Sequence, residues 1–189
     1  HCELIMPGYT FIPFATVNSN CLANSVVCNS PTKNFNIAGL QIANIVCSNK
    51  EWRRRIDRVI NIFEVCDVNP FGPIALEAAY NESEEWLNKL LLYIADNYAL
   101  LTDTFKEYLP DYEVLKLEGT YLVWVDIRKS GLKSDVLAEK LLHAGKVQVN
   151  SGMMYGKTAG ENYIRINIAC TRATLQEGLN RIIKVLSHL

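Results

Sequence analysis

The sequence predicts an α/β protein built in two parts. Short apolar runs rich in Val, Ile and Ala alternate with longer stretches whose apolar residues recur at helical spacing. A helical stretch from Ser83 to Leu109, ended by Pro110, is longer than most globular helices, and we expect it to link the two parts. We place the boundary inside it, with one domain over 1–95 and a second over 96–189.

The first part begins with irregular chain and continues through two expected strands to two helices. Pro31 disfavours a helix just before it, and Ser48 or Asn49 can cap the helix that follows the second strand. In order, we expect irregular chain over 1–22, a strand over 23–29, a polar loop over 30–36, a strand over 40–47, a helix from 49 and a helix over about 72–80.

The second part repeats the alternation without a repeated sequence. Ser134 is expected to cap one helix and Gly145 to follow its end, and Tyr121 and Trp124 are expected in the core. The expected elements are strands over 112–117, 120–127, 146–150 and 162–169, and helices over 134–144 and 174–189.

Composition narrows the class of protein. The chain is 49% hydrophobic with a formal net charge of −1, so we expect a globular core and no nucleic-acid partner. No apolar run approaches the roughly 20 residues that span a bilayer, and no signal-peptide pattern follows His1, so we expect no membrane partner. The six cysteines have no metal-ligand spacing, so we expect no metal, reduced thiols and a cytoplasmic protein.

The most specific pattern is SPTKNFNIAGL over 30–40, which places Lys33 on a polar loop between apolar strands. Taken alone, such a lysine is usually an exposed turn residue. The whole string, however, resembles the lysine segment of fold-type I pyridoxal-phosphate enzymes, the class I and II aminotransferase superfamily. Within it, the string is most similar to the cystathionine beta-lyase branch related to the MalY and PatB proteins.

This resemblance implies a cofactor, pyridoxal 5′-phosphate, and roles for three residues. Lys33 would hold the cofactor covalently, since a lysine amine shifts its pKa readily when it is desolvated. Ser30 would donate to the cofactor phosphate, and Thr32 is the weaker candidate for the same role. The family often has an arginine eight residues after the lysine, where this chain has Gln41.

A second pattern, NYIRINIA over 162–169, places Arg165 in the middle of an apolar strand. Burying an arginine is costly unless it is paired, so one reading is an ion pair with Glu161 or Asp126. The resemblance implies instead that Arg165 binds the α-carboxylate of an amino-acid substrate through two parallel hydrogen bonds. The loop over 149–156 resembles a glycine-containing loop of the family and would then approach the substrate, although Gly152 and Gly156 fit simple turns equally well.

The resemblance extends over essentially the whole chain and corresponds to roughly the C-terminal half of a family member. It implies the C-terminal part of the pyridoxal-phosphate transferase large domain, followed by the small α/β C-terminal domain. It also implies a homodimer, and the segment 69–72 resembles one near the dimer interface.

The resemblance implies an enzyme that acts on a small-molecule amino-acid substrate, and three functions stay open. The first is a carbon–sulfur β-lyase of the cystathionine or cysteine-S-conjugate type, in which Lys33 removes the α-proton. The second is an aminotransferase, in which the same residues serve. The third is an inactive half-fold or regulatory module, because several family elements would lie upstream of His1.

Overall fold

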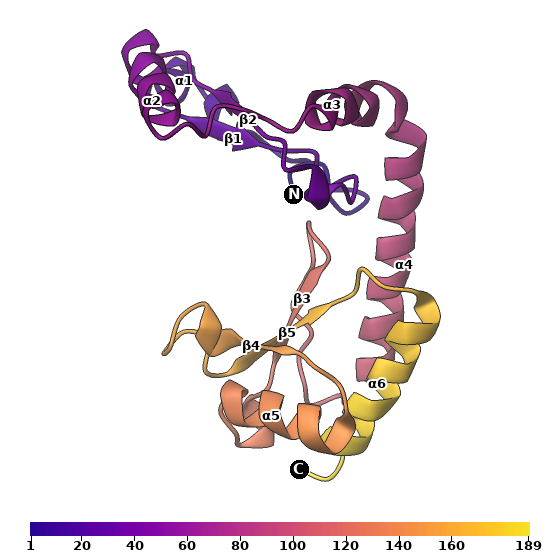
Figure 1. Ribbon diagram of the computed structural model, residues 1–189. Coiled ribbons are helices and arrows are strands. Elements are labelled where there is room, and N and C mark those ends of the chain that lie inside the picture. The colour runs from indigo at the N-terminus through magenta and orange to yellow at the C-terminus, as the bar shows by residue number, and fades with distance from the viewer. The chain divides into compact units, whose positions relative to one another are not determined.

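The computed structural model describes residues 1–189 and confirms an α/β fold. The chain forms two compact units, His1–Leu90 and Leu91–Leu189. Helix α4 (Glu84–Tyr108) begins in the first unit and ends in the second (Figure 1). The division after Leu90 and the expected boundary near residue 95 both lie inside this helix. None of the helices combines the length and apolar character needed to cross a bilayer.

The first unit has a two-stranded antiparallel sheet and several short helices. Strand β1 pairs with β2 in the register Val27–Val46 to Asn29–Asn44. The elements are η1 (Phe14–Thr16), α1 (Ser19–Ala23), β1 (Val27–Asn29), η2 (Ala38–Leu40), β2 (Asn44–Val46), α2 (Lys50–Ile62) and α3 (Phe71–Glu82). The expected strands therefore exist, and the helices expected from 49 and over 72–80 are present.

Both strands of the first unit are shorter than expected, for local reasons. The predicted strand over 23–29 loses its first residues because Asn18 accepts a hydrogen bond from the backbone of Cys21 and caps α1. The predicted strand over 40–47 starts late because Gln41 has a left-handed φ of 49°. The cap at Asn49 is confirmed, since its Oδ1 accepts from the backbone N–H groups of Glu51 and Trp52.

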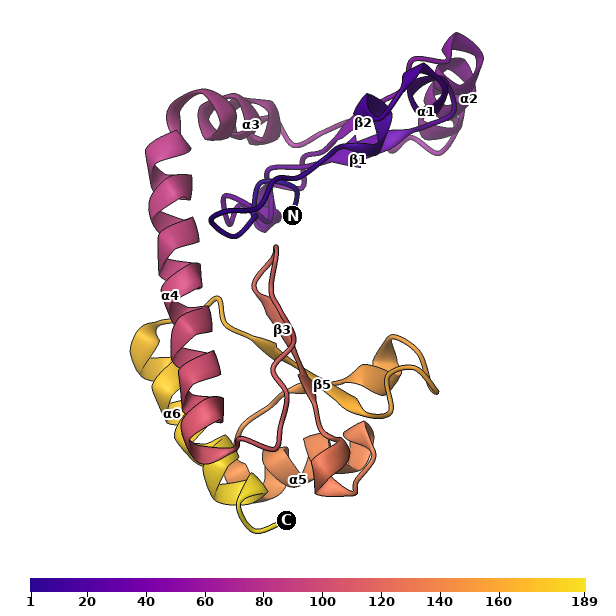
Figure 2. The same ribbon diagram turned by 180° about the vertical axis from the view of Figure 1, so that it is seen from behind.

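The second unit is a three-stranded antiparallel sheet with α4, α5 and α6. The strand order is β3-β5-β4. The bounds are β3 (Leu122–Asp126), η3 (Arg128–Ser130), α5 (Ser134–Gly145), β4 (Asn150–Ser151), η4 (Gly152–Met154), β5 (Tyr163–Asn167) and α6 (Arg172–Leu186). Figures 1 and 2 show α4 and α6 side by side next to this sheet.

The two faces of this sheet differ in composition. Alternate residues of β3 and β5 that face the helices are fully or almost fully buried, and they form the core with residues of α4, α5 and α6. These strand residues are Val123, Val125, Ile164 and Ile166. The opposite row holds Trp124 and Arg165, which are half-buried and lie opposite each other in the register. Trp124 is therefore not the core residue that we expected.

Three expected features of the second unit, two strands and one helix end, are wrong in detail. The run 112–117 is not a strand, because it makes only the single bridge between Val114 and Val125. The strand expected over 146–150 is reduced to Asn150–Ser151, since Lys146 takes the left-handed position at the end of α5. Gly145 is the last helical residue and does not follow the helix end.

Ser134 is also not the expected cap. It is the first helical residue, and its buried hydroxyl contacts the Ser151 hydroxyl at 2.8 Å and the carbonyl oxygen of Gly160 at 3.0 Å. Lys133 occupies the N-cap position instead, and no side chain caps this helix. The two contacts of the Ser134 hydroxyl fix the segment 151–160 to the start of α5.

Candidate functional site

The loop that joins β1 to β2 carries Lys33 and is held by its own hydrogen bonds. The backbone N–H of Phe35 donates to the carbonyl oxygen of Pro31 at 2.9 Å, and that of Ile37 donates to the carbonyl oxygen of Thr32 at 3.0 Å. Pro31 is buried, whereas the side chain of Lys33 is exposed. No carboxylate forms an ion pair with the Lys33 amine. The loop thus presents a free amine on a fixed backbone.

Ser30 and Thr32 lie beside each other in this loop. The Ser30 hydroxyl is 2.5 Å from the carbonyl oxygen of Ile42 and 2.9 Å from the Thr32 hydroxyl. A single hydroxyl proton serves one of these acceptors. The contact with Ile42 is the shorter, so the Ser30 proton goes to that carbonyl oxygen and the Thr32 hydroxyl is the donor to the Ser30 oxygen. Rotation of the Thr32 hydroxyl can turn this proton toward a ligand. Gln41 is exposed and takes a left-handed conformation at the end of η2, three residues before β2 begins.

Two asparagines, Asn29 at the end of β1 and Asn34 within this loop, hold buried polar atoms without partners. Both amide atoms of Asn34, which is fully buried, and the Oδ1 of Asn29 make no hydrogen bond. Buried polar groups are normally satisfied, and an unsatisfied one costs about 1–3 kcal/mol. Phe35, which follows Asn34, is held in place because its ring packs against those of Tyr80 and Trp86, at centroid distances of 5.7 and 6.1 Å.

Arg165 provides a cation without an acidic partner. Asp126 pairs with Arg128 and Glu161 pairs with Lys133, so neither of the acids that we considered pairs with Arg165. The guanidinium carbon lies 4.3 Å from the centroid of the Tyr155 ring, and the buried Nε makes no hydrogen bond. A guanidinium stacked on an aromatic ring keeps its edge free for a planar anion such as a carboxylate.

The same unit contains a second arginine on a tyrosine ring, and the two differ in one respect. Arg172 lies 5.1 Å from the Tyr93 centroid, and its partners within the protein are Asp96, with 3.5 Å between Nη2 and Oδ2, and the Oδ1 of Asn97 at 2.9 Å. Asn97 is fully buried and ties the arginine to the end of β5. Arg172 is therefore satisfied by the protein, whereas Arg165 is not.

The segment that carries Tyr155 is closed at its base by two glycines. A Cβ on Gly152 would lie 2.3 Å from the carbonyl oxygen of Gly160, and a Cβ on Gly160 would lie 2.0 Å from that of Gly152. A Cβ on Gly156 would meet nothing closer than the Ala159 Cβ at 3.7 Å. Of the two glycines left open by the sequence, Gly152 is thus required by backbone packing, and Gly156 is not.

Tyr155 is a site residue that the sequence did not single out. Its ring packs edge-on against Trp124, with centroids 5.4 Å apart, while the Arg165 guanidinium lies over it. The signal available in the sequence was the alternation of Trp124 with Val123 and Val125, which places the tryptophan on the other face of the sheet. The partner of that tryptophan comes from a loop, whose path the alternation does not predict.

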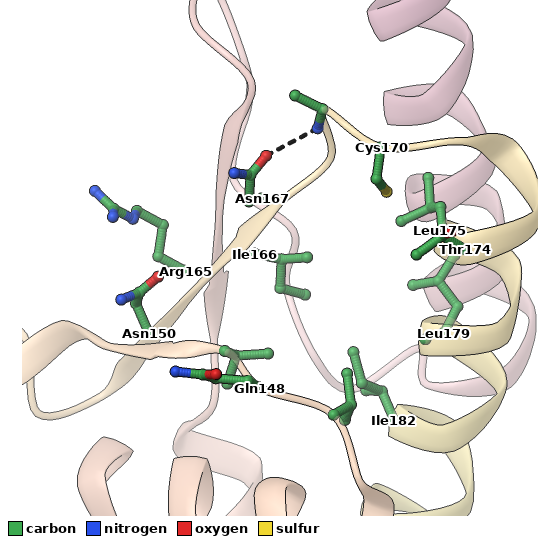
Figure 3. A pocket seen from close by; sticks show the side chains of 14 residues that line it. Gln148, Asn150, Arg165, Ile166, Asn167, Cys170, Thr174, Leu175, Leu179 and Ile182 are labelled. Atoms are coloured by element: carbon green, nitrogen blue, oxygen red, sulfur yellow. Dashed lines mark hydrogen bonds between the residues drawn. The ribbon is translucent and has the colours of Figure 1, made fainter. Parts of the chain in front are cut away.

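The opposite face of β5 borders a cavity of about 320 Å³ between residues 147–150 and α6. Figure 3 shows Arg165 and Asn150 on one side of β5, and Ile166 on the other side, directed toward Leu175 and Leu179 of α6. The cavity wall on the α6 side is apolar except for Thr174. Arg165 is among the residues that line this cavity, but its side chain extends away from α6 in Figure 3 and its guanidinium stacks on Tyr155, so its free edge lies on the Tyr155 side of the sheet.

Comparison with known proteins extends over the whole chain. The sequence model for aminotransferases of class I and II matches residues 10–182. The cystathionine beta-lyase PatB of Bacillus subtilis is 35% identical over 187 residues, which are 99% of this chain and 48% of PatB. The chain thus spans about half the length of the curated relatives it matches.

Solved structures show the same extent of similarity. A PLP-bound protein from Clostridium difficile 630, provisionally named an aminotransferase, is 36% identical with a TM-score of 0.95, covering 98% of this chain and 48% of that one. Cystalysin from Treponema denticola, whose crystal structure contains pyridoxal 5′-phosphate, is 29% identical with a TM-score of 0.95, covering 100% and 48%. The fold and the branch that the sequence indicated are confirmed.

Proposed function

This chain belongs to the class I and II aminotransferase family, and on that premise we propose that the whole protein is a pyridoxal-phosphate-dependent carbon–sulfur β-lyase. The observation that carries this proposal is the similarity to the cystathionine beta-lyase PatB over 99% of the chain, which includes the loop of Lys33. The substrates would be amino acids with a sulfur substituent on Cβ. With one molecule of water consumed, the products would be a thiol, pyruvate and ammonia.

The residues present fit the cofactor. Lys33 offers an unpaired amine for the covalent bond, and Thr32 offers a hydroxyl proton to the phosphate, with Ser30 beside it. The unsatisfied buried amide of Asn34 supports a polar ligand in the immediate surroundings. When bound, pyridoxal phosphate supplies the electron sink for the bond that breaks at the substrate's α carbon.

Two residues of this chain would bind the substrate and remove its α-proton. The guanidinium of Arg165 would hold the substrate's α-carboxylate by two parallel hydrogen bonds, which fixes the orientation of the α carbon. The Lys33 Nζ would take the proton from that carbon as a general base. The electrons released at the α carbon allow the bond between Cβ and sulfur to break, and the thiolate leaves with the bonding pair.

The assay that tests the proposal measures pyruvate release from an S-substituted cysteine by the full-length protein. Pyruvate formed without an added oxoacid supports the lyase. Turnover only after an oxoacid is supplied would identify an aminotransferase, the activity that the similarity to the Clostridium protein favours. No turnover under either condition would contradict both and leave the inactive or regulatory reading.

Lys33 is tested separately with a matched lysine. The Lys33→Ala protein should lose pyruvate release and the absorbance band near the visible edge that borohydride bleaches. The control is Lys50→Ala, because Lys50 is also exposed and lies in the same unit, at the start of α2. Equal loss in both variants would remove Lys33 from its proposed role.

We further propose a homodimer in the cytoplasm. The start of α3, next to the segment 69–72, exposes Phe71 and Ile74 to about two thirds of their surface, which supports a contact with a second copy. The six free cysteines support a reducing compartment. Sedimentation of the full-length protein with Phe71→Asp and Ile74→Asp should give a monomer where the wild type gives a dimer. An unchanged dimer would place the contact elsewhere.

A further inference from the structure

A second pocket adjoins the Tyr155 side of Arg165. It has a volume of about 290 Å³, and we call it the Trp124 pocket. Its lining consists of Leu115, Trp124, Gly152, Tyr155, Gly156, Ala159, Gly160 and Tyr163. None of these residues carries a charge, and three of them are aromatic. The pocket therefore favours an apolar, preferably aromatic, group.

The Trp124 pocket lies next to the guanidinium of Arg165. Trp124 lies directly opposite Arg165 in the sheet register, and Tyr163 lies two residues before it on the same face. Tyr155 carries the guanidinium over its ring and also lines the pocket. An anion bound at Arg165 would thus lie about one aromatic ring away from the pocket.

The spacing matches an S-substituted cysteine. Four single bonds separate the carboxylate carbon of such an amino acid from the first atom of its sulfur substituent, a reach of roughly 5 Å. The centroids of Tyr155 and Trp124 are 5.4 Å apart, and the guanidinium carbon is 4.3 Å from the Tyr155 centroid. A molecule whose carboxylate pairs with Arg165 therefore carries its substituent to the aromatic walls.

We propose that the Trp124 pocket binds the group carried on the substrate's sulfur, so that the protein prefers cysteine conjugates with an aromatic or alkyl substituent to cystathionine. The inference rests on the proposed function, because it takes Arg165 as the carboxylate site. Cystathionine ends in an ammonium and a second carboxylate, and no lining residue offers either group an ion pair. Burying such charges unpaired is costly, whereas a benzyl group gains from the same surroundings.

The pocket is built on a rigid base. The Gly152–Gly160 contact and the hydroxyl groups of Ser134 and Ser151 hold the segment that carries Tyr155. The backbone N–H of Met153 donates to the Ser151 hydroxyl at 3.2 Å. A rigid wall keeps its shape for one class of substituent, and a flexible wall would accept several.

The experiment compares kcat/KM for S-benzyl-L-cysteine and for cystathionine in the full-length protein. The wild type should prefer the benzyl conjugate, and Trp124→Leu should reduce this preference by about tenfold or more, since small changes in an apolar pocket already give such factors. The control is Leu122→Ala, because Leu122 lies on the same face of β3 but outside the pocket, and it should keep the wild-type ratio.

Two results would overturn the inference. One is a wild-type preference for cystathionine. The other is an equal effect of Trp124→Leu on both substrates. Failure of the lyase proposal is recognised separately, because turnover would then require an added oxoacid while the preference for the benzyl group remained. If neither substrate turns over, calorimetric binding of the two amino acids to the cofactor-loaded protein gives the same comparison.

Discussion

Replacing Arg165 by leucine should strongly weaken substrate binding while leaving the fold nearly unchanged. In the structure the guanidinium has no acidic partner and its Nε is unsatisfied, so the folded protein gains little from the charge. The stacking on Tyr155 is worth about 1 kcal/mol. The leucine also removes a buried donor that has no partner, which stabilises the fold by a similar amount. The net change in unfolding free energy should therefore stay within about 1 kcal/mol.

Binding should respond much more strongly than stability. Two charge-assisted hydrogen bonds to a carboxylate contribute together at least about 3 kcal/mol, which corresponds to a rise in KM on the order of 100-fold. Arg165→Lys should recover only part of this, because an ammonium cannot form the parallel pair of bonds. The measurements are KM for an S-substituted cysteine and the thermal midpoint, Tm, of the full-length protein.

Arg172→Leu is the matched control. This arginine also lies on a tyrosine ring, but it is bonded to Asn97 and paired with Asp96. Its removal leaves the buried Oδ1 of Asn97 unsatisfied and should cost about 2–4 kcal/mol of stability, with KM nearly unchanged. If instead Arg165→Leu lowers Tm as much as Arg172→Leu and KM stays constant, Arg165 is a structural residue.

Two further predictions concern stability in the second unit. The hydrogen bonds from Arg128 hold the pKa of Asp126 below its ordinary value. The carboxylate therefore stabilises the fold fully above about pH 4, the ordinary pKa of an aspartate. This stabilisation is lost as the pH falls through the lowered pKa. Asp126→Asn should therefore flatten the acid side of the Tm profile, and an unchanged profile would contradict the pairing. Gly152→Ala should cost at least about 3 kcal/mol in urea denaturation because its Cβ would meet the carbonyl oxygen of Gly160, whereas Gly156→Ala should be neutral, and equal effects would refute the packing argument.

The sequence predicted the helices best. Helix α4 was expected over 83–109 and occupies Glu84–Tyr108, because its apolar period is long and Pro110 ends it. Strand ends were predicted poorly at Gln41 and Lys146, where non-glycine residues adopt a left-handed φ that composition does not reveal. Such conformations are fixed by neighbouring elements rather than by local preference.

The candidate site was predicted in part. Lys33, Ser30, Thr32 and Arg165 followed from strings of sequence, and their roles stay predictions. Tyr155 was missed because its contacts with Arg165 and Trp124 join a loop to two strands. Sequence patterns report periodic elements, and a contact between a loop and a sheet has no period.

The crossing of Gly152 and Gly160 makes the intervening residues a closed loop with a fixed stem. Met154, near the start of this loop, is largely exposed, and Gly156 has room for a side chain. Substitutions confined to residues 153–159 could therefore change ligand specificity without destabilising the second unit. For the same reason, related proteins could differ in ligand specificity through changes in these residues while keeping the same fold.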